Sequence, residues 1–347
     1  MFSTAQRILD DAVAEHAFPA AVVEVGSATQ PLWTHATGRL SFAATSPAAA
    51  EDTVFDLASL TKVLATTPLV MQWVERGLLG LDDLVTTHLP AWRSDDRRHV
   101  TIRDLLSHCS GLPAHEPYFR SHQGRAAFEH AICSEPLAYE PRTAAVYSDL
   151  GFMLLGFILE ESLRRSLQGL MEQMGVVDPL QFLPPELWRH RTAPTSYDPW
   201  RGKQLCGEVD DENAAAIGGV AGHAGLFGTA AAVGTCARHL LQVLDGRTGA
   251  FARSTLMEFV ACRSDVPSSS RALGWDTMRP TSSCGTRMST TAFGHTGFTG
   301  TSLWIDPERA VYVVLLTNRV YPDRANQAIQ SVRRRVHDAV MDALLSR

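Results

Sequence analysis

Strand-forming segments lie near both ends of the chain, separated by a long stretch without them. Residues 20–25 and 32–36 are rich in apolar and β-branched residues around a Gly26-Ser27 turn, which predicts a β-hairpin. Four further segments of this kind come late in the chain, at 273–278, 292–296, 302–305 and 311–317. A sheet built from these segments must therefore be interrupted by the middle of the chain.

Helical patterns complete this outline. Apolar residues recur at helical spacing over residues 5–13 and 324–345, and the stretch 79–260 shows mainly helices and long loops. The sequence therefore predicts an α/β (α+β) fold with an antiparallel sheet flanked by N- and C-terminal helices. We assign the sheet domain to residues 1–78 and 265–347, and an inserted, mainly helical domain to 79–264, with the active site in the cleft between them.

Composition excludes several classes of partner. With 45% hydrophobic and 20% charged residues and a net charge of −6, the chain is typical of a globular protein and not of one that binds nucleic acid or anionic membranes. The longest apolar run, 152–159, is too short to span a bilayer. Residues 1–7 lack the features of a secretory signal, which favours a cytoplasmic protein, or a periplasmic or secreted one if a leader has been removed.

Cysteine and histidine spacings predict neither a metal site nor a cofactor. The six cysteines include no C-x-x-C pair, and the 13 histidines include no H-E-x-x-H motif. Metal-dependent hydrolysis is therefore the weakest of the hypotheses considered. The only partner expected is a small-molecule substrate, and the oligomeric state is left open.

Ser59 and Lys62 lie three residues apart at the start of a predicted helix. Apolar residues recur at helical spacing from Leu60 to Val74, and Gly77 ends the segment. Positions i and i+3 share one face of a helix, so the Lys62 amine can approach the Ser59 hydroxyl. A serine nucleophile needs a neighbouring base, which this pair would supply. The alternative is that Ser59 merely caps the helix and Lys62 is a solvated residue of its first turn.

A lysine acts as a base only when it is neutral, and its reference pKa is about 10.4. We therefore expect burial and the positive end of the helix dipole to lower the pKa of Lys62. Of the 31 basic residues only Lys62 and Lys203 are lysines, so a lysine at this position stands out from the generic surface cations of the chain. Pro68 predicts a kink or break in the same helix.

Two further stretches carry chemistry. Tyr147-Ser148-Asp149 precedes an apolar helix, so the Tyr147 phenol could transfer a proton if a cation such as Lys62 holds its pKa below the usual value. Alternatively, Ser148 or Asp149 only caps that helix. Residues 293–300 predict a strand with three glycines, whose backbone N–H groups could bind an acyl substrate and, with that of Ser59, form an oxyanion hole. The alternative is a twisted edge strand with His295 on its surface.

In this order the three motifs resemble the signature of penicillin-recognising serine hydrolases. The chain looks most like the class C β-lactamase branch, which also contains esterases and D-Ala-D-Ala carboxypeptidases. Stretches 104–113 and 222–229 resemble phrases that recur in this branch. The resemblance covers essentially the whole chain and implies a β-lactamase/transpeptidase-like fold.

The resemblance also implies roles for particular residues. Ser59 would be acylated, Lys62 would hold or accept its proton, and Tyr147 would be the general base. Asp149 would bind Lys62 and the substrate. The substrate edge and the oxyanion hole would be formed by His295, Thr296, Gly297 and the backbone N–H of Phe298.

Two residues depart from the usual pattern of the family. Asp149 replaces an asparagine and, when ionised, only accepts hydrogen bonds. His295 replaces a lysine, and its charge is conditional near pH 7. Both changes disfavour strong β-lactamase activity. The densest basic cluster, Arg333 to Arg335, is interpreted as a solvated face of the C-terminal helix.

The leading hypothesis is a serine hydrolase that forms an acyl-Ser59 intermediate on a carboxylic ester or a D-amino-acid peptide or amide. A weak β-lactamase is an alternative within this class. A catalytically idle protein that binds a peptidoglycan fragment or a partner is an alternative from another class. We expect specificity to depend on the loops near 113–125 and 197–211.

Overall fold

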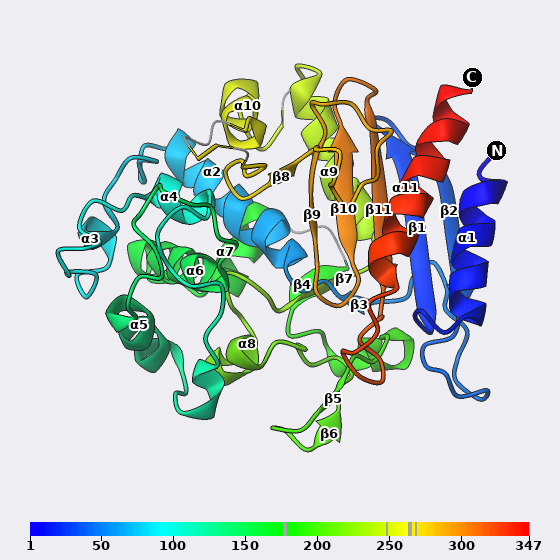
Figure 1. Ribbon diagram of the computed structural model, residues 1–347, viewed down its shortest axis with the longest axis horizontal. Coiled ribbons are helices and arrows are strands. Elements are labelled where there is room, and N and C mark those ends of the chain that lie inside the picture. The colour runs from blue at the N-terminus through cyan, green and yellow to red at the C-terminus, as the bar shows by residue number, and fades with distance from the viewer. Residues whose placement is uncertain (176–178, 248, 263–265, 268, 347) are drawn as a thin grey trace.

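The two ends of the chain meet in one antiparallel sheet. The computed structural model describes residues 1–175, 179–247, 249–262, 266–267 and 269–346. Six strands pair in the order β2-β1-β11-β10-β9-β8 (Figure 1). Their bounds are β1 (Ala20–Ser27), β2 (Pro31–Gly38), β8 (Asp276–Thr277), β9 (Phe293–Thr296), β10 (Ser302–Asp306) and β11 (Val311–Thr317). Ala21 of β1 lies opposite Thr317 of β11, so the predicted sheet is confirmed.

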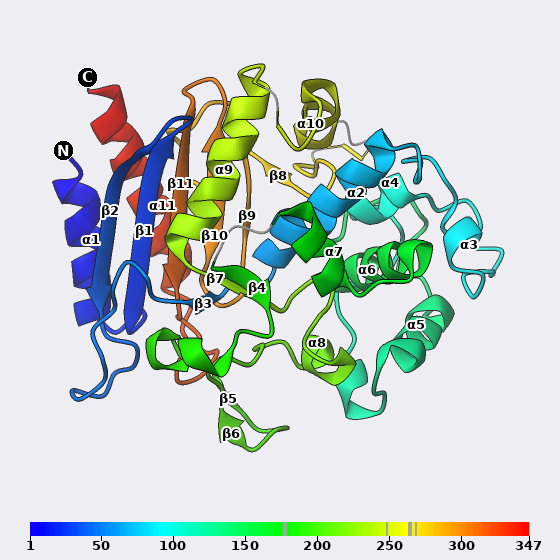
Figure 2. The ribbon, with the colours of Figure 1, turned by 180° about the vertical axis from the view of Figure 1, so that it is seen from behind.

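Both faces of the central strands are buried. Along β11, Val313 and Leu315 belong to one apolar cluster, whereas Tyr312 and Val314 belong to another on the opposite face. This alternation follows from the two-residue period of a strand. Helices α1 (Ser3–Ala14) and α11 (Ile329–Leu345) cover the first face (Figure 1), and α9 (Ala230–Leu244) covers the second (Figure 2).

A buried polar contact fixes α9 to the sheet. Arg238 of α9 forms an ion pair with Glu24 of β1 at 3.0 Å, and the Tyr312 hydroxyl donates to the same carboxylate at 2.6 Å. Gly234 leaves room for this carboxylate, since a Cβ there would overlap Glu24. Helix α9 lies within the segment 79–264 that was assigned to the inserted domain, yet it packs on the sheet. The proposed domain boundaries stay a prediction.

The remaining helices and short strands lie beside this sheet. The helices are α2 (Thr67–Glu75), α3 (Val85–His88), α4 (Ile102–Leu106), α5 (Arg125–Ser134), α6 (Asp149–Leu163), α7 (Leu167–Met174), α8 (Glu212–Ile217) and α10 (Arg253–Val260). Strands β3 (Phe55–Asp56), β7 (Leu226–Gly228) and β4 (Leu180–Phe182) form a small sheet, and β5 (Tyr197–Asp198) pairs with β6 (Lys203–Gln204). Among the described residues we find no helix with both the length and the apolar character needed to cross a membrane.

Three local features of the structure differ from the sequence-based predictions or add detail to them. The strand predicted over 273–278 is reduced to β8, because Gly274 adopts a φ of +86°. The C-terminal helix begins at Ile329, not at 324. The break expected at Pro68 takes the form of a π-helical turn over Lys62–Thr66 followed by α2, in which Pro68 occupies the first turn and needs no N–H partner.

Candidate active site

Ser59 lies on a tight turn between β3 and the π-helical turn. The preceding Ala58 has a φ of +47°, a left-handed conformation that is unfavourable for a residue with a Cβ. Asp56 holds this turn by accepting the Ala58 N–H at 2.8 Å, and Thr61 donates to the Ala58 carbonyl at 2.6 Å. The surrounding hydrogen bonds therefore fix the position of the Ser59 backbone.

Lys62 is completely buried and makes three hydrogen bonds. Its Nζ donates to Ser59 Oγ at 2.9 Å, to Asp149 Oδ1 at 2.7 Å and to the His223 carbonyl at 3.2 Å. These contacts use all three protons of an ammonium group. The structure thus brings Ser59, Lys62 and Asp149 together, and it excludes the interpretation of Lys62 as a solvated residue.

The expectation that the site lowers the pKa of Lys62 is wrong. Burial does lower it, but the nearby Asp149 carboxylate and the Tyr147 phenol raise it further, so that the pKa of Lys62 lies above its ordinary value. Lys62 is therefore a cation at neutral pH in the substrate-free site. The decisive residue is Asp149, which lies 87 positions away in the sequence.

Tyr147 packs against the Lys62 ammonium, whose Nζ lies 4.8 Å from the centre of its ring. The ring lies between His108 and His295, at centroid distances of 4.7 and 5.7 Å. The Tyr147 hydroxyl is buried, and no described residue gives it a hydrogen bond of normal geometry. Burial raises its pKa by more than Lys62 lowers it, so the condition that Lys62 holds the pKa of Tyr147 below its usual value is not met in the substrate-free site.

Ser148 and Asp149, at the start of α6, have different roles. Ser148 caps the helix, with its Oγ accepting the Gly151 N–H at 3.4 Å and donating to the Pro113 carbonyl at 2.7 Å. The capping alternative is thus confirmed for Ser148. Asp149 instead directs its carboxylate to Lys62, and its second oxygen lies 3.9 Å from His115.

The glycine-containing edge of β9 lies directly against the nucleophile turn. Thr301 accepts the Gly297 N–H at 2.8 Å through its carbonyl, and its hydroxyl donates to the Leu57 carbonyl at 3.0 Å. A Cβ on Gly297 would overlap Thr301 and lie 2.6 Å from that carbonyl. Within the described structure the N–H groups of Ser59 and Phe298 have no hydrogen-bond acceptor, so both are available to a substrate oxygen.

His295 is buried, in contrast to the alternative that placed it on the surface. Its Nδ1 lies 2.8 Å from the Thr296 carbonyl, and its Nε2 has no partner among the described residues. Burial, followed by the charges of Lys62 and Arg271, holds the pKa of His295 well below its usual value. The expectation of a conditional charge near pH 7 is therefore wrong, because His295 is neutral there.

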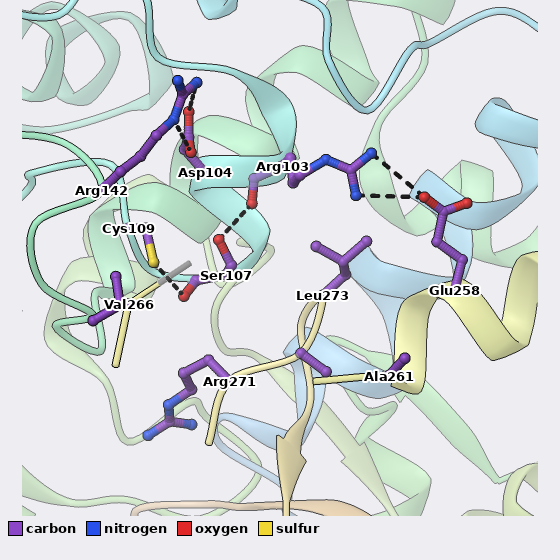
Figure 3. Close-up of a pocket in the computed structure, with 11 residues that line it drawn as sticks. Arg103, Asp104, Ser107, Cys109, Arg142, Glu258, Ala261, Val266, Arg271 and Leu273 are labelled. Carbon is purple, nitrogen blue, oxygen red and sulfur yellow. Dashed lines mark hydrogen bonds and ion pairs between the residues drawn. The ribbon is translucent and has the colours of Figure 1, made fainter. Parts of the chain in front are cut away.

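Arg271 is a residue of this site that the sequence reasoning missed. Its guanidinium lies 5.1 Å from the centre of the Tyr147 ring, and no ion pair to it is found among the described residues (Figure 3). In the same view Arg103 and Arg142 are paired with Glu258 and Asp104. Nothing in the local sequence distinguishes Arg271, since it follows a Ser-rich loop with no motif.

The cavity of Figure 3 is not a substrate site, because its volume of about 50 Å³ holds only a few water molecules. The neighbouring cleft has a volume of about 750 Å³, which suits a small organic molecule. Among the predicted residues, those that line the cleft are Ser59, Tyr147, Asp149, His295, Thr296, Gly297 and Phe298. Lys62 contacts Ser59 from beneath.

Comparison with known proteins identifies the family. The sequence profile described as "Beta-lactamase" matches residues 5–336. The chain belongs to the Beta-lactamase family. A protein of Salmonella gallinarum named "Putative D-alanyl-D-alanine carboxypeptidase" is 30% identical, over 81% of this chain and 73% of that protein. A Salmonella typhi protein of the same name is equally similar.

Solved structures confirm the β-lactamase/transpeptidase-like fold. EstCE1, described as a hydrolase with promiscuous acyltransferase activity, superposes with a TM-score of 0.77 and 21% identity, covering 98% of each chain. A class C β-lactamase from Rhodobacter sphaeroides gives a TM-score of 0.76 and 22% identity, covering 99% of each chain. The fold of this chain is thus shared with proteins described as a hydrolase and as a class C β-lactamase.

Proposed function

We propose that this chain is a serine hydrolase that forms an acyl intermediate on Ser59. The observation that carries the proposal is the 2.9 Å hydrogen bond from Lys62 Nζ to Ser59 Oγ, beside a cleft large enough for a small acyl substrate. Asp149 and Tyr147 complete a compact polar site around this bond. Such an arrangement suits nucleophilic catalysis, because the Ser59 hydroxyl lies in contact with an amine that can accept its proton once that amine is neutral.

In the proposed mechanism the Lys62–Tyr147 pair must first lose one proton. Ser59 Oγ then attacks the substrate carbonyl, and its proton passes to the neutral lysine or the phenolate. The oxygen of the tetrahedral intermediate accepts hydrogen bonds from the backbone N–H groups of Ser59 and Phe298. The proton is then passed to the leaving group. In the second half of the reaction water attacks the acyl-Ser59 ester, the same base accepts a proton from the water, and that proton returns to Ser59 Oγ.

We infer that the substrate is a carboxylic ester or a D-amino-acid peptide or amide. Two features favour this choice over a β-lactam. His295 is neutral and Asp149 is a carboxylate, so neither offers the positive charge or amide donor that Lys and Asn would offer. The name of the Salmonella relatives supports the peptide, and the promiscuous acyltransferase activity ascribed to EstCE1 supports a hydrolase of broader acyl specificity.

Covalent labelling tests this proposal. A fluorophosphonate should add to the wild-type protein, and intact-protein mass spectrometry should find the adduct absent in Ser59→Ala. Ser331→Ala, which changes an exposed serine of α11, is the control and should label normally. Labelling of Ser59→Ala at the wild-type rate would exclude Ser59 as the nucleophile.

The same experiment with a penicillin addresses the alternatives. A stable adduct on Ser59 indicates a D-Ala-peptidase, whereas an adduct that forms and disappears with loss of the drug indicates a weak β-lactamase. Labelling by the phosphonate without any penicillin adduct favours the esterase. Failure of both reagents on the wild-type protein would favour a catalytically idle binding protein.

A further inference from the structure

Among the residues that the structure describes, two buried arginines have no carboxylate partner. Among the described residues three arginines are almost fully buried: Arg97 is 3% exposed, Arg319 5% and Arg333 6%. Arg97 forms an ion pair with Asp96 at 3.0 Å. The part of the chain that the structure describes contains no ion pair for Arg319 or Arg333. Because a buried charge is unfavourable without a counter-charge, these two arginines require an explanation.

Arg333 lies on α11 and lines the active-site cleft. One of its terminal nitrogens donates to the Thr301 carbonyl at 3.2 Å, and its Nε is buried with no partner among the described residues. His337, one helical turn further on, is also completely buried, and its pKa is lowered to about 3 by burial and by Arg333. His337 is therefore neutral at physiological pH and cannot serve as a counter-charge for Arg333. The interpretation of Arg333 as part of a solvated face is wrong.

Arg319 follows β11 and lies beside the predicted oxyanion hole. Its Nε donates to the Phe298 carbonyl at 2.8 Å, and its guanidinium carbon lies 4.5 Å from the centre of the Phe298 ring. Asp210 is the carboxylate whose charge acts on Arg319, but it is ion-paired with Arg324 at 3.0 Å. Within the described part of the chain, Arg319 and Arg333 thus donate to backbone carbonyls at one end of the cleft and have no carboxylate of their own.

Both ends of the cleft carry charged groups, but these are balanced differently. Beside the nucleophile the Asp149 carboxylate is ion-paired with Lys62, and Arg271 lies near the neutral His295. Beyond Phe298 lie the guanidinium groups of Arg319 and Arg333, for which the described residues provide no ion pair. A negatively charged group on a bound substrate is attracted to these two guanidinium groups.

We propose that Arg333 and Arg319 form a subsite for a carboxylate group of the substrate. This inference rests on the proposed function and makes it more specific: the substrate is an ester or amide that carries a negatively charged carboxylate at the end of the cleft beyond Phe298. A carboxylate suits the site because its two oxygens match the planar fork of donors on a guanidinium. The bound group would also supply the missing counter-charge.

Matched substrate pairs test the subsite on either side of the scissile bond. One pair is 3-acetoxybenzoate and its methyl ester, in which the charge lies on the leaving group. The other is 4-nitrophenyl hydrogen glutarate and 4-nitrophenyl methyl glutarate, in which it lies on the acyl chain. For at least one pair, the wild-type kcat/KM should be higher for the negatively charged substrate than for its neutral methyl ester. Arg333→Gln should reduce that preference about tenfold or more and leave the neutral ester nearly unaffected.

Two further variants separate charge recognition from stability. Arg333→Lys keeps a positive charge and should retain part of the preference for the anion. Arg335→Gln, on the exposed side of the same helix, should retain all of it. If the wild-type protein shows no preference in either pair, or if Arg333→Gln reduces anionic and neutral turnover equally, the subsite is excluded.

Binding to the Ser59→Ala variant separates this inference from the proposed function. Calorimetry should show that 3-acetoxybenzoate or 4-nitrophenyl hydrogen glutarate binds more tightly than its neutral partner, and that adding Arg333→Gln removes the difference. This result would support the subsite even if the wild-type protein hydrolysed none of the esters. Equal binding of charged and neutral partners would exclude the subsite and leave the nucleophile assignment intact. If Arg333→Gln does not fold, the wild-type preference and Arg333→Lys decide the question.

Discussion

At the scale of single residues, Asp149 sets the protonation state of the candidate site. Its carboxylate contacts Lys62 and raises the pKa of both Lys62 and Tyr147. The sequence could predict the Ser59–Lys62 contact, since it depends only on helical spacing. It could not predict the direction of the pKa shift of Lys62, because this depends on a residue brought near only by folding.

The pH dependence of activity should follow from this arrangement. The mechanism needs the Lys62–Tyr147 pair to lose one proton, and both pKa values are raised, so kcat/KM should increase as the pH rises above neutrality. In Asp149→Asn the negative charge is lost while an amide oxygen can still accept from Lys62. Both pKa values should fall, the rising limb should shift to lower pH, and kcat/KM at pH 7 should increase several-fold.

A pH–rate profile on an ester substrate measures this shift. Asp276→Asn is the matched control, because Asp276 is a carboxylate of the same cleft that is not among the main causes of the pKa shifts of Lys62 and Tyr147. Its profile should match that of the wild type. A rising limb that stays in place or moves to higher pH in Asp149→Asn would contradict the assigned role of Asp149.

At the scale of elements, the edge that follows β9 couples the sheet to the nucleophile turn. Gly297 allows this close approach, because an added Cβ would overlap Thr301 and lie 2.6 Å from the Leu57 carbonyl. In Gly297→Ala the two segments must separate, which displaces the Phe298 N–H from that of Ser59. We expect the acylation rate to fall about 100-fold, the magnitude typical of losing one oxyanion donor.

Stopped-flow or rapid-quench labelling with an ester measures the acylation rate, and Tm measures stability in parallel. Gly151→Ala in α6 is the control, since the nearest atom to its added Cβ would be 3.6 Å away, an ordinary contact. Unchanged acylation in Gly297→Ala would show that the two segments do not jointly bind the substrate oxygen.

The strands and the C-terminal helix also show which parts of the fold could be predicted from the sequence. The hairpin of β1 and β2 and the long strand β11 have clear apolar patterns and were predicted nearly to their ends. Strand β8 was predicted too long, because apolar residues around Gly274 belong to a bend and not to a strand. Helical periodicity predicted α11, but it could not show that the side of α11 carrying Arg333 lines the cleft.

At the scale of the whole molecule, Asp56 of β3 joins two segments that lie far apart in the sequence. This carboxylate accepts the Ala58 N–H beside the nucleophile and the Asp210 N–H from the loop before α8, at 2.8 and 2.7 Å. Burial, and then the charge of Asp210, raises the pKa of Asp56 to about 7. The strand patterns at the two ends of the chain predicted the main sheet, but no motif identified Asp56 as a junction between distant segments.

This raised pKa makes a prediction about the stability of the folded chain. Asp56 binds a proton more tightly in the folded than in the unfolded state, whose pKa is near 3.9. Its contribution is therefore most favourable below about pH 4 and is lost as the pH rises toward about 7. In Asp56→Asn the side chain is neutral at every pH, so this loss disappears, although one of the two N–H groups loses an acceptor at a cost of about 1–3 kcal/mol.

Urea unfolding of wild type and Asp56→Asn at several pH values measures this contribution. The variant should be the less stable protein at pH 4, and the difference should shrink or reverse by pH 8, because the wild type then carries a buried charge that costs up to roughly 4 kcal/mol. Asp276→Asn, which changes a carboxylate outside this junction, is the control. If the difference between wild type and Asp56→Asn is independent of pH, Asp56 is ionised in the folded state throughout, and the junction is held by a charged hydrogen-bond acceptor.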